Sequence, residues 1–313
     1  MWFKNLRIYS FDAENMQKHG ASVDLAAKLE AYQFHPCGSL DPMRYGFVEP
    51  IADGGYAFFN GGQHVMICAK RQEKILPAGV INERLAEIVA HTEVAESRSV
   101  GRKERQTLRD EVIFSLLPKA LTKSSYTHGY IDYANSLIVI NAASASAAED
   151  FLSKLREALG SLKCYPLQTK SVPSQAMTHW VNLGFIDNPV YGLAPKCLQF
   201  GYDCHLDGGK DGRVVTFKNQ DLSADEVNEL VRTGMTVEKL GLEWRESVSF
   251  QLCDDLAIKR LKFADLIQDK ANDHNPESKA EQFAVDFAIM SATLSQLIAD
   301  LVKSLGGEAD NAC

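Results

Sequence analysis

Residues 129–160, GYIDYANSLIVINAASASAAEDFLSKLREALG, decide the fold of this chain. Two extended runs, 129–133 and 136–141, are separated by Ala134–Asn135, and this pattern predicts a β-hairpin. A hairpin is the unit from which an antiparallel sheet is built. We therefore expect antiparallel strands in the core.

An amphipathic helix is predicted directly after this hairpin. Ser146 and Glu149 have the spacing of a capping box, in which each side chain binds a free backbone amide at the start of a helix. Gly160 can adopt the left-handed conformation that stops a helix. The apolar residues between them recur at helical spacing: Phe151, Leu152, Leu155 and Leu159.

A second, longer copy of the pattern lies near the C-terminus. Residues 248–252 alternate between apolar and polar, Asp254–Asp255 can form a turn, and 256–263 can form the return strand. A polar linker, 269–279, leads to the strongest helix, which Gly306–Gly307 end. Its apolar seam is Phe283, Phe287, Met290, Leu294, Leu297 and Leu301. Such a seam can pack in the core or bind another helix, and we favour the core.

The two copies predict the α+β class, as a pseudo-symmetric body of antiparallel sheets with packed helices.

Between the N-terminal part of the chain and the two copies, the sequence pattern changes from strand-like to helical. Asn82 can cap a helix running to about Glu96, and a second helix is expected from Arg102 to about Leu117, where Pro118 stops it. We expect these helices to form a protruding tip. The predicted division is 1–75, 125–163 and 245–313 for the central body, 76–124 for the helical tip, and 164–244 for a base or accessory region with a helix capped by Ser223.

Composition excludes several classes of protein. The chain has 313 residues, and 33 Lys and Arg against 41 Asp and Glu give a formal net charge of −8. Its 45% hydrophobic and 24% charged residues exclude a disordered chain. We find no apolar run near the roughly 18–20 residues of a membrane span, and no signal-peptide core. We expect a cytoplasmic protein with no membrane partner. Taken alone, the acidic balance argues against nucleic-acid binding.

The cysteines do not indicate a metal or cofactor site. There are seven, an odd number in a chain without an export signal, and we expect free thiols in a reducing compartment. Cys197, Cys204 and His205 are the nearest approach to a metal cluster, and buried or loop thiols are the favoured explanation. We predict no metal and no cofactor.

Asp254–Asp255 is the only Asp-Asp pair in the sequence. Two carboxylates can bind magnesium or act as a general acid and a general base. Neighbouring residues of a strand, however, point in opposite directions. A hairpin turn followed by basic Lys259, Arg260 and Lys262 is the more economical interpretation. We therefore assign no catalytic residue.

A basic segment in the predicted tip, in contrast to the acidic net charge, is compatible with nucleic-acid binding. Residues 98–109 contain five basic residues and one acid, a net charge of +4 that leaves −12 for the rest of the chain. Arg102, Arg105 and Arg109 share one helix face, because steps of three and four keep a face. From the residues alone, a solvated helix face is the favoured explanation of this pattern. A local basic surface can nevertheless bind DNA while acidic residues elsewhere face solvent. Weaker candidates of this kind are Lys70, Arg71, Lys74, Arg213 and Lys218.

Motifs along nearly the whole chain resemble the RdgC family of bacterial recombination-associated proteins. They are Trp2–Leu6, Phe34–Ser39, Glu73–Pro77, Asp110–Val112, Ser115–Pro118, Ala148–Asp150, Leu159–Leu162, Asp254–Asp255, Leu261–Phe263 and Leu305–Ala309. The stretch around 165–215 departs from the resemblance and is longer than in the family.

The resemblance implies a non-enzymatic, sequence-independent DNA-binding protein. It implies a closed, ring-shaped homodimer with duplex DNA in a positively charged hole, which restrains RecA-promoted recombination at the nucleoid. A ring would reconcile DNA binding with a net charge of −8, because binding residues can lie on the inner wall while the outside stays acidic. Whether single strands are also bound, and whether RecA is touched directly, stays open.

The resemblance also suggests individual positions. Arg98 and Lys119 match basic positions of the family's tip, and Gln220 matches a polar DNA contact. Leu121 stands where the family has an aromatic residue that helps close the ring, and Met235 replaces a lysine. The predicted DNA-binding residues are Arg98, Arg102, Lys103, Arg105, Arg109, Lys119, Lys218 and Gln220, with Leu121 as dimer contact.

Two alternatives belong to other functional classes. The first is a magnesium-dependent nuclease or phosphohydrolase that uses Asp254 and Asp255. The second is an interaction scaffold whose long C-terminal helix binds a helix of another protein.

Overall fold

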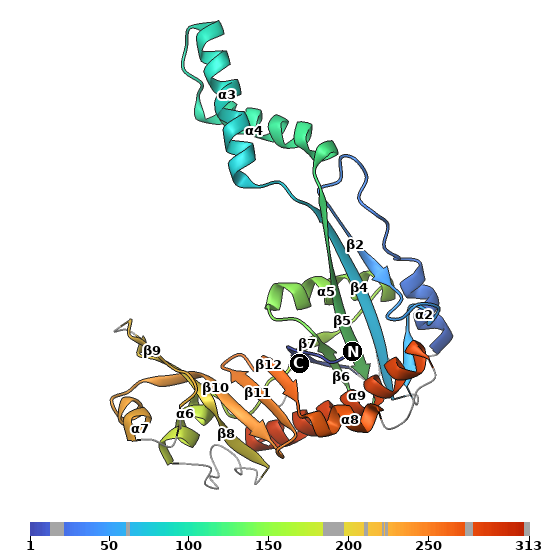
Figure 1. The fold of residues 1–313 in the computed structure, drawn as a ribbon, viewed down its shortest axis with the longest axis vertical. Coiled ribbons are helices and arrows are strands. Elements are labelled where there is room, and N and C mark those ends of the chain that lie inside the picture. Colours follow the sequence, from blue (N-terminus) through green and yellow to red (C-terminus); the bar gives the residue numbers. More distant parts are fainter. Residues whose placement is uncertain are drawn as a thin grey trace. The chain divides into compact units, whose positions relative to one another are not determined.

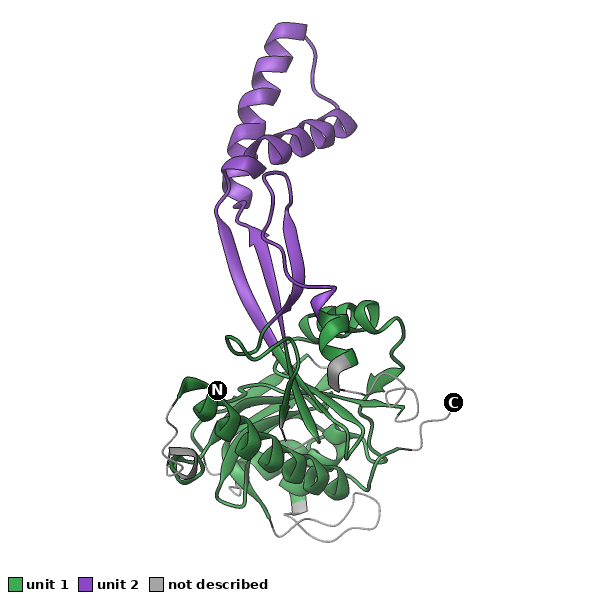
Figure 2. Cartoon of the chain, turned by 90° about the vertical axis from the view of Figure 1, so that its right-hand side faces the viewer, with its two compact units in different colours: residues 1–29, 49–67, 128–313 green, residues 30–48, 68–127 purple. Residues whose placement is uncertain are grey.

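The computed structural model describes residues 1–12, 22–60, 63–183, 197–209, 212–220, 222, 225–272 and 278–309. Within them the chain has the predicted α+β class, with two antiparallel sheets and helices packed on them (Figure 1). The chain forms two compact units, coloured separately in Figure 2: unit 1 is 1–29, 49–67 and 128–313, and unit 2 is 30–48 and 68–127. The predicted division into body, tip and base region stays a prediction.

The first sheet has seven strands in the order β2-β4-β5-β6-β1-β7, and β3 pairs with β4 off this path. The strands are β1 (Arg7–Phe11), β2 (Met43–Val48), β3 (Phe58–Asn60), β4 (His64–Lys74), β5 (Thr122–Asp132), β6 (Leu137–Ile140) and β7 (Cys164–Pro166). The predicted hairpin is β5–β6, in which Gly129 pairs with Ile140 and Asp132 pairs with Leu137.

The turn of this hairpin is fixed by the side chain of Asp132. One carboxylate oxygen accepts the backbone N–H groups of Ala134 and Asn135 at 3.0 and 3.1 Å, and the other accepts the side-chain amide of Asn135 at 2.8 Å. Ser136 completes the turn in the left-handed region, with φ of 54°. The acid is therefore a structural part of the hairpin.

Helix α5 (Ala145–Leu159) follows the hairpin as predicted, but its start differs from the prediction. Ser144 is the N-cap, and its side-chain oxygen accepts a backbone N–H of the first turn at 3.3 Å. The capping box predicted at Ser146 and Glu149 is wrong, because Ser144 already has the extended backbone that an N-cap requires. Gly160 ends the helix with φ of 78°, as predicted.

The second sheet lies in unit 1 and has five strands in the order β12-β11-β10-β8-β9. The strands are β8 (Leu198–Asp207), β9 (Val214–Phe217), β10 (Thr236–Trp244), β11 (Val248–Cys253) and β12 (Ile258–Phe263). The predicted second hairpin is β11–β12, with Asp254 and Asp255 in its turn. The predicted capping residue Ser223 lies outside the described residues.

Helices cover one face of this second sheet. They are α6 (Pro173–Leu183), α7 (Asp225–Arg232) and α9 (Lys279–Ser304). Alternate residues of β8 and β10, such as Leu206 and Leu240, share one core with Trp180 of α6 and Leu294 of α9. Because side chains alternate along a strand, the intervening residues of the sheet lie on the face that these helices do not cover.

Helix α9 provides the spine of the core of unit 1. Its predicted seam residues are at most 8% exposed: Phe283, Phe287, Met290, Leu294, Leu297 and Leu301. The favoured core interpretation is confirmed, and the face that the scaffold alternative needs is covered within the chain.

By length and composition α9 could cross a membrane. The expectation that no segment reaches that threshold is therefore wrong, because so few charges interrupt this helix.

Unit 2 contains both helices predicted for the tip, α3 (Ala78–Glu96) and α4 (Arg102–Leu116), followed by a short 3-10 turn, η1 (Leu117–Lys119). Helix α3 begins after Pro77, so the cap predicted at Asn82 is wrong. A proline suits the entry to a helix because the first amide of a helix needs no acceptor. Asn82 instead accepts a hydrogen bond from the second helix.

The sequence patterns missed three short helices of the described chain, α2 (Ser22–Glu30), α6 (Pro173–Leu183) and α8 (Asp265–Asn272). Helix α8 overlaps the start of the predicted polar linker 269–279. The linker prediction is wrong over this overlap, because Ile267 is buried in the core and fixes the segment as a helix.

Candidate nucleic-acid interface

Three of the basic residues predicted in unit 2 present unpaired charge. Arg102, Lys103 and Arg105 are exposed at the start of α4. Within the described part of the chain they take part in no salt bridge, although neighbouring Arg98 does. Their positive charge is therefore available to phosphate groups of a ligand.

Arg98 is different, because two carboxylates already bind it. Its two Nη atoms each donate to Glu104 at 2.6 Å, and its Nε donates to Glu96 at 2.7 Å. The hydrogen bonds to Glu104 and then to Glu96 raise the pKa of Arg98, and the bond from Arg98 lowers the pKa of Glu104. The charge of Arg98 is thus locally neutralised.

Arg109 and Lys119 complete the basic set of unit 2. Nη1 of Arg109 donates to Oδ1 of Asn82 at 2.8 Å and so joins α4 to α3. Lys119 is exposed at the end of η1. Arg109 therefore supports the helix pair, whereas Lys119 is open to a ligand.

Unit 2 also exposes several large apolar side chains. Leu121, the predicted dimer contact, is 77% exposed, and its backbone carbonyl accepts the N–H of Ile75 at 2.8 Å. Val94 and Phe114 are 81% and 58% exposed. Exposed apolar side chains mark a contact with a partner chain where they form a continuous patch, and the dimer contact at Leu121 stays a prediction.

The other two predicted residues, Lys218 and Gln220, belong to unit 1 and follow β9. Both are exposed, and the backbone N–H of Gln220 donates to the carbonyl of Tyr202 on β8 at 3.1 Å. Asn219 has φ of 53°, which turns the segment back over the sheet. Met235, where the family resemblance places a lysine, is buried in the core and presents no charge.

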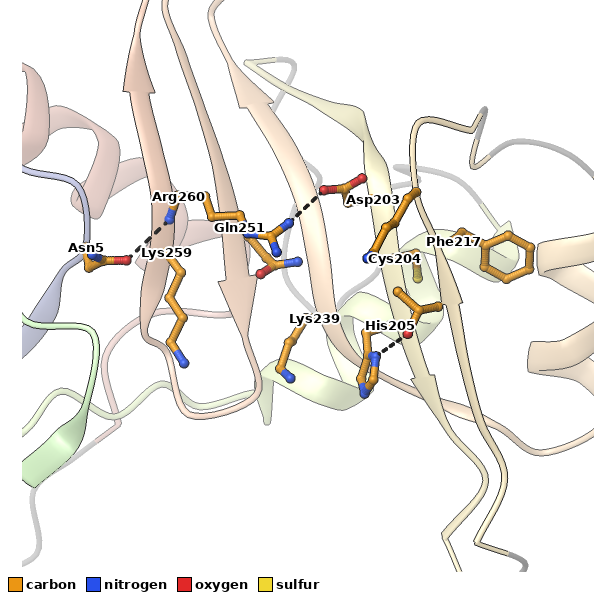
Figure 3. A pocket seen from close by; sticks show the side chains of 11 residues that line it. Asn5, Asp203, Cys204, His205, Phe217, Lys239, Gln251, Lys259 and Arg260 are labelled. Carbon is orange, nitrogen blue, oxygen red and sulfur yellow. Dashed lines mark hydrogen bonds and ion pairs between the residues drawn. The ribbon is translucent and has the colours of Figure 1, made fainter. Parts of the chain in front are cut away.

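A shallow basic groove, here called the sheet groove, crosses the uncovered face of the five-stranded sheet (Figure 3). It consists of two adjoining pockets of about 340 and 420 Å³, both lined by Asp203, Gln251 and Arg260. Its charged residues are the cations Lys218, Lys239, Lys259, Arg260 and Lys262 and the acids Asp203 and Glu243. Five cations against two carboxylates make the groove positive within an acidic chain.

Arg260 reaches across the sheet groove. Its φ of 52° lies in the left-handed region, which costs a residue other than glycine about 1–3 kcal/mol. The register of β11 and β12 shifts between Ser249 and Gln251, and such a bulge re-aims a side chain. Nη1 of Arg260 donates to Oδ2 of Asp203 on β8 at 3.0 Å (Figure 3).

This ion pair is too exposed to account for the strained backbone. The side chains of Arg260 and Asp203 are 63% and 31% exposed, and surface pairs contribute only about 0–1 kcal/mol. Backbone strain that local contacts do not offset is typical of functional positions.

Two glycines leave the floor of the sheet groove bare. A Cβ atom at Gly201 would lie 3.0 Å from the carbonyl carbon of Gly241, and a Cβ atom at Gly241 would lie 3.0 Å from the carbonyl oxygen of Asp203. Both separations are tighter than ordinary contacts, so β8 and β10 would have to move to accept a side chain at either position. Backbone therefore forms this part of the floor.

The suspected metal cluster does not form. Nδ1 of His205 lies 2.8 Å from Oγ1 of Thr216, and burial raises the pKa of the Cys204 thiol to about 12. The Sγ atom of Cys197 donates to Asp300 at 3.5 Å. Across the described residues, no three His, Cys, Asp or Glu side chains are arranged to hold a metal ion.

The Asp254–Asp255 pair has a structural role in its turn. Oδ2 of Asp255 accepts Nη1 of Arg7 at 2.6 Å, and Oδ1 accepts the backbone N–H of Ala257 at 3.2 Å. Burial raises the pKa of Asp255, but the hydrogen bonds from Arg7 and Ala257 outweigh it and hold the pKa below its usual value. Asp254 and Asp255 are both exposed, but Arg7 binds Asp255, so the pair does not offer two free carboxylates.

Among the cations of the sheet groove, sequence reasoning identified only Lys218 as a candidate ligand contact. The triplet Lys259, Arg260 and Lys262 was visible in the sequence but was interpreted only as the basic residues that follow a hairpin turn. Its meaning depends on the pairing of β10 with β8, which sets Lys239 opposite His205. No local pattern shows a pairing between residues so far apart in sequence.

Known proteins resemble the whole chain. A model of the family described as "Putative exonuclease, RdgC" matches residues 1–308. The recombination-associated proteins RdgC of Aeromonas hydrophila and Haemophilus influenzae are each 37% identical to it, over 98% of this chain and 99% of the relative. The protein of that name from Salmonella paratyphi B is 38% identical over 99% of both chains.

Proposed function

Because the chain belongs to the RdgC family, we propose that it is a sequence-independent DNA-binding protein that encircles duplex DNA as a ring-shaped homodimer. In this proposal it acts at the nucleoid in the cytoplasm and restrains RecA-mediated recombination by occupying the DNA. It binds without catalysing a reaction and without a cofactor.

The observation that carries the proposal is the unpaired basic cluster at the start of α4. Arg102, Lys103 and Arg105 are exposed and free of ion pairs within the described residues, although the chain as a whole is acidic. Contacts of cations with phosphate carry no sequence information, so a surface of this kind supports binding without base recognition.

The exposed apolar residues of unit 2 support the dimer. Leu121 stands where the family resemblance places an aromatic residue and is exposed, and Phe114 adds exposed apolar area in the same unit. In a closed ring these side chains would be covered by the second copy. An acidic outer surface would then keep the ring soluble while the lumen binds DNA.

Binding of a labelled duplex across a range of salt concentrations tests the site. Replacing Arg102, Lys103 and Arg105 by alanine is expected to weaken binding and to reduce the log–log salt slope by about 0.9 for each phosphate that the variant no longer neutralises. A matched control replaces three exposed lysines of unit 1 outside the sheet groove, Lys163, Lys170 and Lys303. Equal binding by the two triple variants would reject the assignment of this site.

A comparison of circular and linear DNA tests encirclement. A closed ring should stay on relaxed circular duplex after a salt challenge but slide off linear duplex of the same length. Sedimentation velocity with and without duplex reports the dimer and its complex. Equal dissociation from both forms of DNA would contradict a ring, even if binding itself is confirmed.

A nuclease is the second candidate, because the description of the matching family model names an exonuclease. The Arg7–Asp255 ion pair weighs against Asp255 as a metal ligand. Incubation with magnesium, described in the Discussion, distinguishes the two functions.

A further inference from the structure

We propose that the sheet groove is a nucleic-acid site that binds the phosphodiester backbone of a strand, and that the Arg260–Asp203 ion pair is a latch which the strand opens. This inference rests on the proposed DNA-binding function. It goes beyond that function, and beyond the predicted contacts Lys218 and Gln220, by assigning the groove cations of β10 and β12 and a residue exchange that accompanies binding.

The shape and charge of the groove fit a strand rather than a single ion. The two pockets adjoin along the sheet, and the cations lie on several elements, with Lys218 after β9, Lys239 on β10, and Lys259 and Lys262 on β12. A row of cations over a bare floor matches a chain of phosphates, each of which carries one negative charge.

The lining also explains why such binding would not read sequence. Figure 3 shows long flexible cations and small polar groups converging on the groove, with Gln251 between them. Gly201 and Gly241 leave backbone in the floor, so a sugar-phosphate chain can approach the sheet closely. Phosphate contacts position a strand without recognising its bases.

Arg260 can exchange its carboxylate partner Asp203 for a phosphate group without leaving Asp203 unpartnered. When Arg260 turns to a phosphate, Asp203 keeps the backbone N–H of Asn219, which donates to Oδ1 at 3.3 Å. Asp203 is also partly exposed, so water can replace the guanidinium. Neither group is left buried without a partner, and the exchange therefore has a low energetic cost.

The positive φ of Arg260 keeps its side chain over the groove in both states. The backbone N–H of Arg260 donates to Oδ1 of Asn5 at 3.4 Å, and β12 pairs with β11 on either side of the bulge. Only the side chain has to move. A guanidinium is suited to this exchange because it binds carboxylate and phosphate in the same forked geometry.

Two variants of the full-length protein test the site in opposite directions. Lys239→Ala with Lys259→Ala is expected to weaken duplex binding roughly three- to tenfold and to lower the salt slope by about 0.9 for each phosphate that is no longer neutralised. Asp203→Asn removes the competing acceptor and is expected to tighten binding roughly two- to fivefold, the range that corresponds to a weak surface ion pair.

Matched controls carry the same charge changes elsewhere in unit 1. Lys163→Ala with Lys170→Ala controls the lysine pair, and Glu149→Gln on α5 controls the acid, since all three residues are exposed and outside the groove. Thermal unfolding of each variant confirms that it folds. Arg260→Gly is an additional test of the site. Glycine adopts the positive φ of this position without strain, and the substitution removes the guanidinium.

The outcomes separate this inference from the proposed function. If the wild type binds duplex and the groove variants match their controls, the sheet groove is not a nucleic-acid site, although the proposed function stands. If the wild type binds no DNA, both fail. Competition with inorganic phosphate identifies the source of the phosphate. Displacement of DNA by millimolar phosphate at constant ionic strength would indicate a site for a free anion and overturn the strand assignment.

Discussion

The hydroxyl of Ser295 donates to the buried carboxylate of Asp132 at 2.7 Å and so joins helix α9 to hairpin β5–β6. Nε2 of His64 lies 3.4 Å from the same carboxylate oxygen. Burial raises the pKa of Asp132, but the hydrogen bonds from His64, Asn135 and Ser295 outweigh it and hold the pKa well below its usual value. The ionised acid therefore holds three elements of unit 1 together.

Removal of the Ser295 hydroxyl should destabilise the protein. Ser295→Ala is expected to lower the free energy of unfolding by about 1–3 kcal/mol, because a buried charged acceptor loses a donor. Urea unfolding at neutral pH measures the change. Gln296→Ala, at the exposed neighbouring position of α9, is the control, with an expected change within about 0.5 kcal/mol. Equal changes in the two variants would contradict a role for this bond.

The Asp132 network should also make stability depend on acid pH. The folded pKa of Asp132 is depressed, so its contribution is fully present above the unfolded pKa of about 3.9 and is lost as pH falls toward the folded pKa. The difference in unfolding free energy between wild type and Asp132→Asn is therefore expected to shrink from about pH 5 downward. A difference that stays constant down to about pH 2.5 would show that this carboxylate is not the titrating group.

Release of Arg98 from its carboxylates should strengthen DNA binding. Glu104→Gln removes one of the two carboxylates that neutralise Arg98, the one that accepts from both Nη atoms, so that Arg98 is held only by Glu96 and presents more of its charge to phosphate. We expect tighter duplex binding and a salt slope steeper by up to about 0.9. Salt-titrated binding measures both, and Glu83→Gln on α3 has the same charge change at an exposed control position. Identical behaviour of the two variants would mean that Arg98 does not reach the DNA.

A charge at Leu121 should weaken the proposed dimer contact. Leu121→Asp places a carboxylate where a 77% exposed apolar side chain would be covered by the second copy, and burial of an unpaired charge is costly. Sedimentation equilibrium is expected to show more monomer at a given concentration than wild type. Leu266→Asp changes another exposed leucine, 68% exposed on α8 of unit 1, and serves as the control. The contact assignment fails if the two variants dissociate alike.

Magnesium should not turn this protein into a nuclease. End-labelled linear duplex incubated with excess protein and magnesium is expected to remain intact, because Asp255 is bound by Arg7 and cannot act freely as a ligand. Denaturing electrophoresis detects any shortening. Degradation that disappears in Asp254→Ala would reverse the proposed function in favour of the exonuclease. Degradation that persists in this variant would indicate another site or a contaminant.

Elements with local patterns could be predicted from the sequence. Helix α4 ends before Pro118, which has no N–H to continue the helical bonding, and α9 follows the spacing of its apolar seam. Start positions were less certain because several polar residues compete to cap a helix. Ser144 prevails over Ser146, and Pro77 over Asn82. The pseudo-symmetry of the two hairpin–helix copies stays a prediction.

Properties that depend on which side chains pair in the folded chain could not be predicted. The charges of residues 98–109 were visible along the chain, but the sequence did not show that Glu96 and Glu104 neutralise Arg98 while Arg102 and Arg105 stay unpaired. The sheet groove was hidden for the same reason, because its parts meet only through the order of strands in the second sheet.

The order in which unit 1 is assembled from the chain bears on its synthesis. Its residues come from three separate stretches, and its core is incomplete without α9, which follows the other elements of unit 1 in the sequence. At roughly 5–20 residues per second, about ten to thirty-five seconds separate the emergence of unit 2 from that of α9. During this interval the apolar residues of unit 1 that share a core with α9 are not covered by it. Until α9 has emerged, the apolar residues that pack against it in the folded core remain without their partner.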